Sequence, residues 1–127
     1  MPGAPDPVAV PAQTAVLTLP AEIDITNARR LCGKVGAALV SGATVVVADM
    51  TATTFCDSSG ARALVLAWEQ AAVNGTELRI VVPSVAVRPG FTLMGLDGFL
   101  PFYPSLNAAL TAHPAPASAA RPWLGRS

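Results

Sequence analysis

The chain has 127 residues, enough for one domain and too few for two. Hydrophobic residues make up 52% and charged residues 13%, which excludes a disordered polyelectrolyte. Eight basic residues balance eight acidic ones, so the chain has no basic excess for binding nucleic acid or anionic membranes. It contains no signal-peptide pattern and no apolar run of the roughly 20 residues that a membrane span needs. We therefore expect a cytoplasmic protein without membrane insertion.

Both ends have the composition of tails. Residues 1–13 contain four prolines, and residues 113–127 are rich in Pro and Ala. Such segments bury too little apolar area to offset the entropy lost on ordering. The sequence therefore predicts one domain over 14–112 between two disordered tails. Trp123 and Leu124 are either a docking motif or ordinary surface residues.

Strand and helix patterns alternate in the first half of this domain. A short apolar segment at 16–19 predicts a strand that Pro20 ends. An amphipathic helix follows, with apolar positions at helical spacing: Ala28, Leu31, Cys32, Val35 and Leu39. Gly42 is suited to ending this helix. The β-branched run at 44–48 predicts a strand buried on both faces.

The same alternation continues in the second half. The spacing predicts a helix over 61–72, ended by Asn74-Gly75, and a strand at 78–82. Ser84 could cap a third helix with Val87, Phe91 and Met94 on its inner face. Because Pro89 disrupts a helix interior, that helix is either kinked or starts again at Pro89. A short strand at 100–103 and a helix capped by Ser105 complete the pattern.

The alternating order predicts an α/β fold with a mostly parallel, four- to five-stranded mixed sheet and about four helices. Functional groups in such folds gather beyond the carboxyl ends of the strands. Two segments of this chain lie there, one over 21–27 and one over 55–60. We expect these two segments to approach each other.

The turn Asp57-Ser58-Ser59-Gly60 is the most informative part of these segments. Asp and Ser are preferred N-caps, so a purely structural cap is one interpretation. Gly60 is costly inside a helix, and close approach by another backbone would explain it. A phosphate on Ser58 would add a charge of about −1.5 to −2, which the helix N-terminus tolerates and a docked partner does not. This turn therefore has the properties of a phosphorylation switch.

Catalytic and metal-binding patterns are lacking. Cys32 and Cys56 match no zinc or redox spacing and are expected to be small buried hydrophobes. The one histidine, His113, stands at the edge of the C-terminal tail, where it is a poor candidate for a base that activates serine. The chain has neither a nucleophile elbow nor a phosphate-binding loop. We expect no enzymatic activity, no cofactor and no metal.

Three segments and one shorter motif resemble the STAS domain of anti-sigma factor antagonists. They are Leu19-Pro20-Ala21-Glu22-Ile23-Asp24, Val45-Val46-Val47-Ala48-Asp49-Met50, Phe55-Cys56-Asp57-Ser58-Ser59-Gly60-Ala61 and Met94-Gly95-Leu96-Asp97. The resemblance covers about residues 14–112 and implies the STAS fold. It also implies bacterial partner switching in transcription regulation.

In that scheme the unphosphorylated protein binds an anti-sigma factor that is also a serine kinase, and a sigma factor is released. The kinase phosphorylates the serine that corresponds to Ser58, the complex dissociates, and a phosphatase restores the active form. The implied partner-binding residues are Glu22, Asp24, Asn27, Asp57, Ser58, Ser59, Gly60, Ala61 and Arg62. We expect a monomer or weak dimer.

The chain also departs from the family pattern. Ala21 stands where a Gly is usual, and Ala61, which is followed by Arg62, stands after the turn in place of a bulky aliphatic residue. Arg62 lies on the expected kinase-facing surface, so it could alter partner choice. The alternative function is a non-phosphorylated STAS interaction module in a sensory or lipid-transport complex.

Overall fold

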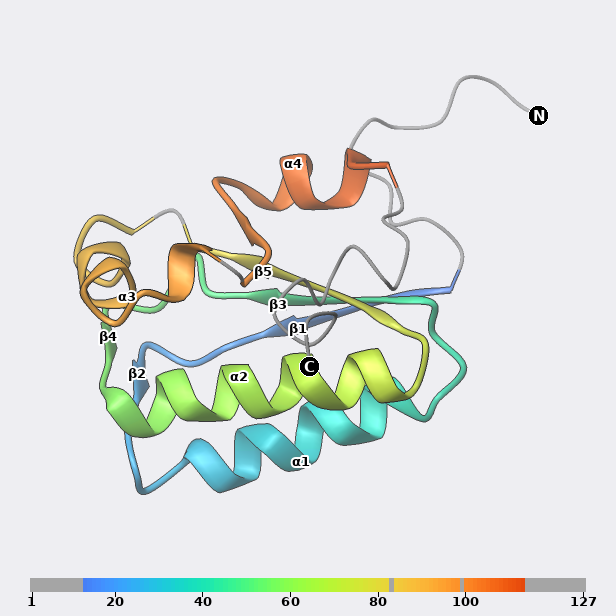
Figure 1. Ribbon diagram of the computed structural model, residues 1–127, viewed down its shortest axis with the longest axis horizontal. Coiled ribbons are helices and arrows are strands. Elements are labelled where there is room, and N and C mark those ends of the chain that lie inside the picture. The colour runs from blue at the N-terminus through green and yellow to red at the C-terminus, as the bar shows by residue number, and fades with distance from the viewer. Residues whose placement is uncertain (1–12, 83, 99, 114–127) are drawn as a thin grey trace.

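A four-stranded sheet forms the centre of the computed structural model, which describes residues 13–82, 84–98 and 100–113 (Figure 1). The strand order is β1-β3-β5-β6. These strands are β1 (Thr14–Thr18), β3 (Val45–Asp49), β5 (Glu77–Val81) and β6 (Phe102–Tyr103). Each pair is parallel, so the α/β class with a mostly parallel sheet is confirmed. The mixed character that we expected is not seen among the described residues.

Two long helices, α1 (Ala28–Leu39) and α2 (Ser58–Val73), cover one face of this sheet (Figure 1). The larger core lies between them and the sheet. Leu31 and Val35 enter it from α1, Trp68 from α2, and Val46 and Ile80 from the strands. The two helices begin and end within a few residues of the predicted bounds, as is usual for helix ends.

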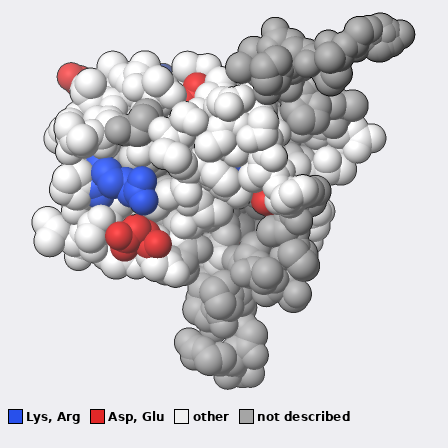
Figure 2. All heavy atoms as spheres, turned by 90° about the horizontal axis from the view of Figure 1, so that it is seen from above, with Lys and Arg blue, Asp and Glu red and all other residues white. Residues whose placement is uncertain are grey.

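A short helix, α4 (Leu106–Thr111), covers the opposite face. Ser105 caps it as predicted, because its hydroxyl oxygen accepts a hydrogen bond from the Ala108 amide at 3.0 Å. The described atoms on this face carry few charged side chains (Figure 2). Its apolar contacts form a smaller core that includes Val47, Val81 and Leu110.

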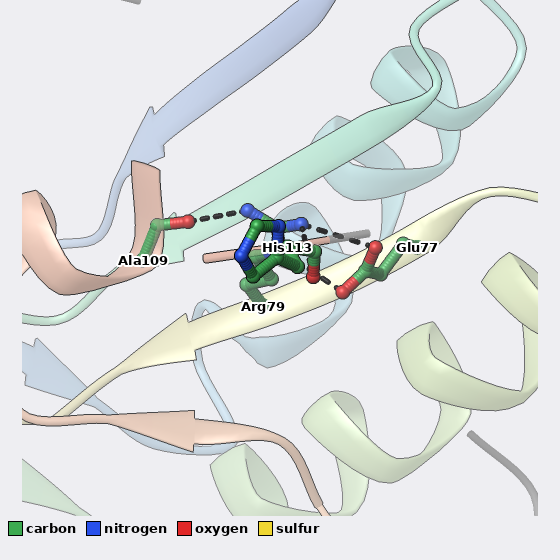
Figure 3. Close-up of polar contacts among 4 residues, drawn as sticks. All are labelled: Glu77, Arg79, Ala109 and His113. Atoms are coloured by element: carbon green, nitrogen blue, oxygen red, sulfur yellow. Dashed lines mark hydrogen bonds and ion pairs between the residues drawn. The ribbon is translucent and has the colours of Figure 1, made fainter. Parts of the chain in front are cut away.

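A buried arginine ties α4 to the sheet (Figure 3). The Arg79 guanidinium pairs with both carboxylate oxygens of Glu77, at 3.0 and 3.1 Å. It also donates to the backbone carbonyls of Ala109 and His113. Arg79 is only 3% exposed, so these four hydrogen bonds replace the water that its charge has lost.

Two short strands extend the structure beyond the carboxyl end of the main sheet. β2 (Glu22–Ile23) and β4 (Phe55–Cys56) pair in parallel as a separate two-stranded sheet. The sequence pattern treats both segments as loops, since two residues are too few to show an alternation. Their pairing positions the start of α2.

The third helix, α3 (Arg88–Leu93), is unkinked and begins one residue before Pro89. The prediction that Ser84 caps it is wrong, because the N-cap is Val87 and the Ser84 hydroxyl oxygen accepts from the Ala86 amide instead. Pro89 lies in its first turn, where the missing amide would have no helical partner in any case. Val87 and Phe91 are buried, and the Phe91 ring stacks on Phe102 with centroids 5.3 Å apart. The prediction that Met94 faces inward is wrong, because the helix ends at Leu93 and Met94 is 42% exposed.

A single turn of 3-10 helix, η1 (Leu96–Gly98), follows α3. The strand predicted at 100–103 is shorter than expected and covers only β6. Residues 1–12, 83, 99 and 114–127, with Trp123 and Leu124, lie outside the described residues. The domain boundaries and the two tails therefore remain predictions. Within the described part, no helix is long and apolar enough to cross a membrane.

Candidate functional site

The N-terminus of α2 is fixed by Asp57. This residue is the N-cap, and its Oδ1 atom accepts hydrogen bonds from the backbone amides of Ser59 at 2.9 Å and Gly60 at 3.2 Å. The Asp57 amide in turn donates to the Ile23 carbonyl at 3.1 Å. The cap interpretation is therefore correct for Asp57, and the serines do not perform this role.

Ser58 is the first residue of α2 and is exposed. Among the described residues its hydroxyl makes no hydrogen bond, so it is accessible for chemistry. The amide ends of the first turn give this position a positive electrostatic potential. Ser59 is half-buried beside it. The geometry thus distinguishes the two serines: Ser58 points to solvent at the helix start, while Ser59 is partly covered.

Gly60 is required by contacts with β2 and β4. A Cβ atom at this position would lie 2.5 Å from the Cys56 Sγ and 2.7 Å from the Ile23 Cγ2. Both distances are below any normal carbon contact. The predicted close approach is therefore real, but two side chains make it and not another backbone, so that detail of the prediction is wrong.

The loop between β2 and α1 is held by its own side chains. The Asn27 amide group donates to the Glu22 carbonyl at 2.8 Å, and its oxygen accepts from the Asp24 amide at 3.0 Å. The Asp24 carboxylate accepts hydrogen bonds from the hydroxyl and the backbone amide of Thr26. These two bonds, the hydroxyl first, lower the pKa of Asp24. Asp24 is therefore a preformed anionic group on this loop.

The two segments expected to approach each other do so. They are joined by the β2–β4 ladder and by the Asp57-to-Ile23 hydrogen bond. The Thr53 hydroxyl adds a further link, donating to the Pro20 carbonyl at 2.8 Å. Thr53 is fully buried, and sequence reasoning missed it because nothing distinguishes it from the nearby Thr51 and Thr54.

The predicted site residues do not all lie on the surface. Ser58, Glu22 and Arg62 are exposed, whereas Gly60 and Ala61 are buried and could act only by shaping the turn. Among the described residues, no hydrogen bond or ion pair joins Asp24 directly to Asp57 or Ser58.

The two cysteines, Cys32 and Cys56, are half-buried and not fully buried as expected. Burial, followed by the charge of Asp57, raises the pKa of the Cys56 thiol to about 11, so this thiol stays protonated at neutral pH. His113 follows the C-cap of α4, on the other face of the sheet. In the part of the chain that the structure describes, no group of three or more His, Cys, Asp or Glu side chains could hold a metal ion.

A parallel sheet with helices on both faces and a capped serine turn beyond its carboxyl end defines a small α/β domain. The STAS domain family model matches residues 7–109. The chain therefore belongs to the STAS family, and the predicted STAS fold is confirmed.

Solved structures with the same fold include two described as anti-sigma factor antagonists. One, from Mycobacterium paratuberculosis, is 28% identical, with a TM-score of 0.72 over 84% of this chain and 95% of that one. The other, SpoIIAA in its unphosphorylated form, is 24% identical, with a TM-score of 0.64 over 80% of this chain and 89% of that one.

A third neighbour comes from a different class of protein. It is a sulfate transporter family protein from Wolinella succinogenes, 21% identical, with a TM-score of 0.71 over 84% of this chain and 93% of that one. Identity this low shows the fold alone. No curated protein sequence gives a significant match.

Proposed function

We propose that this chain is an anti-sigma factor antagonist that phosphorylation of Ser58 switches off. In its unphosphorylated form it binds an anti-sigma factor that is also a serine kinase, and the sigma factor is released. Phosphorylation of Ser58 dissociates that complex, and a phosphatase restores the unphosphorylated, binding-competent form. The proposal places the cycle in the cytoplasm. The observation that carries it is the exposed Ser58 hydroxyl at a helix start that Asp57 already caps.

The capping arrangement supports a switch that leaves the fold intact. Because Asp57 satisfies the amides of Ser59 and Gly60, helix α2 does not depend on the Ser58 hydroxyl. A phosphate at this position gains roughly 0.3–1 kcal/mol per charge from the helix N-terminus. The nearby Asp57 carboxylate opposes part of that gain. Folding is therefore nearly unaffected by phosphorylation.

The effect on a docked partner is much larger. A partner that covers phosphorylated Ser58 would have to bury a dianion, and removing that charge from water costs several kcal/mol. The preformed Asp24 carboxylate on the adjoining loop adds negative charge to the same surface. The structure of the M. paratuberculosis anti-sigma factor antagonist, 28% identical, is consistent with this assignment.

Mass spectrometry after incubation with ATP and each anti-sigma factor kinase of the source organism tests the proposal. We expect one added phosphate, located on Ser58. Ser58→Ala should abolish the modification, and the matched variant Ser59→Ala should keep it. Failure of every such kinase to modify Ser58 contradicts the proposal.

Binding separates this function from that of a STAS module that is never phosphorylated. Ser58→Ala should remain bound to the kinase in the presence of ATP, whereas Ser58→Asp should not bind. Equal binding of the two variants would mean that Ser58 is not the switch, and the non-phosphorylated interaction module would then be the better assignment.

A further inference from the structure

A groove lies between the N-terminal halves of α1 and α2, beside the proposed phosphorylation site. Its volume is about 420 Å³. The facing side chains are short: Ala28 and Cys32 on α1, and Ala63 on α2. Because these side chains do not fill the space between the helices, a hollow remains that is large enough for a side chain from another molecule. Ser59 lines the same hollow and connects it with the start of α2.

Large apolar side chains border this α1–α2 groove. Ile25 is 78% exposed, and Leu66 is 46% exposed. A single exposed aliphatic residue is ordinary on a protein surface. Two of them around one apolar hollow form a patch of the kind that marks an interaction site.

The charge of the groove has one sign. Arg29 and Arg62 both line it, and no acidic residue does. Neither arginine forms an ion pair within the described residues. An apolar hollow bordered by two such guanidinium groups attracts a carboxylate that arrives with an apolar side chain, because Arg binds carboxylates through two parallel hydrogen bonds.

We propose that the α1–α2 groove binds an acidic, apolar segment of the anti-sigma factor partner, one apolar side chain entering the hollow and flanking carboxylates pairing with Arg29 and Arg62. This inference rests on the proposed function and specifies the chemistry of the partner. It also assigns Arg62, a departure from the family pattern, to partner selection.

Charge excludes two other occupants. The segment 114–127 of this chain contains two arginines and no Asp or Glu, so its side chains offer no carboxylate to the groove. A second copy docked symmetrically would bring Arg29 and Arg62 against the same two residues of its neighbour. An acidic partner is the occupant that this charge distribution favours.

Helix geometry links the groove to the switch. Arg62 follows Ser58 by four residues on α2, so the two side chains lie on adjacent turns of one face. A phosphate on Ser58 therefore comes within reach of the Arg62 guanidinium and competes with the partner's carboxylate for it. Phosphorylation would then weaken the docked complex at the groove as well as at Ser58.

The dissociation constant of the unphosphorylated chain for its anti-sigma factor kinase tests the groove. Arg29→Glu and Arg62→Glu should each weaken binding at least about tenfold, as expected for a lost charge pair at an interface. Arg30→Glu makes the same charge change one residue away, outside the groove, and should alter binding less than about twofold. All three side chains are exposed, so thermal unfolding should confirm that each variant folds.

The outcomes separate this inference from the proposed function. If the wild type binds the kinase and all three variants change the dissociation constant equally, the proposed role of the groove is wrong and the proposed function still stands. No binding of the wild type to any anti-sigma factor kinase overturns both.

Alkylation of Cys32, followed by peptide mapping, identifies the occupant directly, because Cys32 lines the groove. The kinase should protect Cys32 in the wild type. Protection that rises with chain concentration without kinase would indicate a second copy. Faster alkylation after deletion of residues 114–127 would indicate the chain's own segment. Either of these results overturns the proposal.

Discussion

Charged side chains are arranged differently on the α4 face of the sheet and at the N-terminal end of α2. On the α4 face, Arg79 is buried and donates hydrogen bonds to the Glu77 carboxylate and to two backbone carbonyls (Figure 3). Around the start of α2, Arg29 and Arg62 have no ion-pair partner among the described residues, and the Ser58 hydroxyl has no hydrogen bond there. The first arrangement stabilises the fold, and the second leaves polar groups available to another molecule.

The largest stability effect should come from Arg79→Met. It removes the guanidinium from the partly buried Glu77 carboxylate and detaches two carbonyls at the end of α4, at a cost of about 3–5 kcal/mol. Urea unfolding measures this change. The control Arg30→Met, on the surface of α1, should stay within about 0.5 kcal/mol of the wild type. A loss of less than about 1 kcal/mol for Arg79→Met would contradict a stabilising role of this network.

Gly60→Ala should have the next largest effect on stability. The new methyl group would overlap the Cys56 and Ile23 side chains, which costs about 1–3 kcal/mol. Gly33→Ala on α1 is the matched control: a Cβ there meets nothing within 4 Å, and helix propensity favours Ala by up to about 1 kcal/mol. Opposite signs for the two substitutions are expected in urea unfolding, and a stabilising Gly60→Ala would show that the turn is looser than described.

The two N-caps provide a smaller test that compares the two regions directly. Asp57→Ala and Ser105→Ala each remove a side-chain acceptor from a helix start and should each cost about 1 kcal/mol. Only Asp57→Ala should also weaken binding to the anti-sigma factor kinase, because it loosens the turn that presents Ser58. If both variants bind the anti-sigma factor kinase equally well, the Asp57 cap does not contribute to the proposed partner surface.

The last effect is confined to alkaline pH and is caused by Cys56. The folded chain keeps this thiol protonated up to a pKa of about 11, above the ordinary value of 9.0. Between these two pKa values, the folded state binds more protons at Cys56 than the unfolded state does. This contribution to stability is therefore complete below pH 9 and is lost as the pH rises through 11. Cys56→Ala should flatten that decline in urea unfolding under reducing conditions, and an unchanged decline would contradict the assignment to Cys56.

Much of this architecture could be predicted from the sequence because the long elements have strong periodicity. The buried run around Val46 and the helical spacing of Leu31 and Val35 each indicate one structure. Parallel topology alone was enough to predict that the segments with Asp24 and Ser58 lie close together, because both follow the carboxyl ends of strands. The capping role of Asp57 also followed from its residue type.

Other features depend on tertiary contacts that no local pattern encodes. The two-residue strands β2 and β4 exist because they pair with each other. In the sequence, Arg79 is a single polar residue within an apolar strand. Its hydrogen bond to the Ala109 carbonyl on α4 exists only in the folded chain. The α1–α2 groove arises only where the short side chains of Ala28 and Ala63 face each other across two helices.

The most direct test of the switch is the dissociation constant of the anti-sigma factor kinase for the same chain with and without phosphate on Ser58. We expect phosphorylation to weaken binding at least about 100-fold, equivalent to about 2.7 kcal/mol. Removal of the phosphate by a phosphatase should restore the original value. Equal dissociation constants for the two forms would contradict the account.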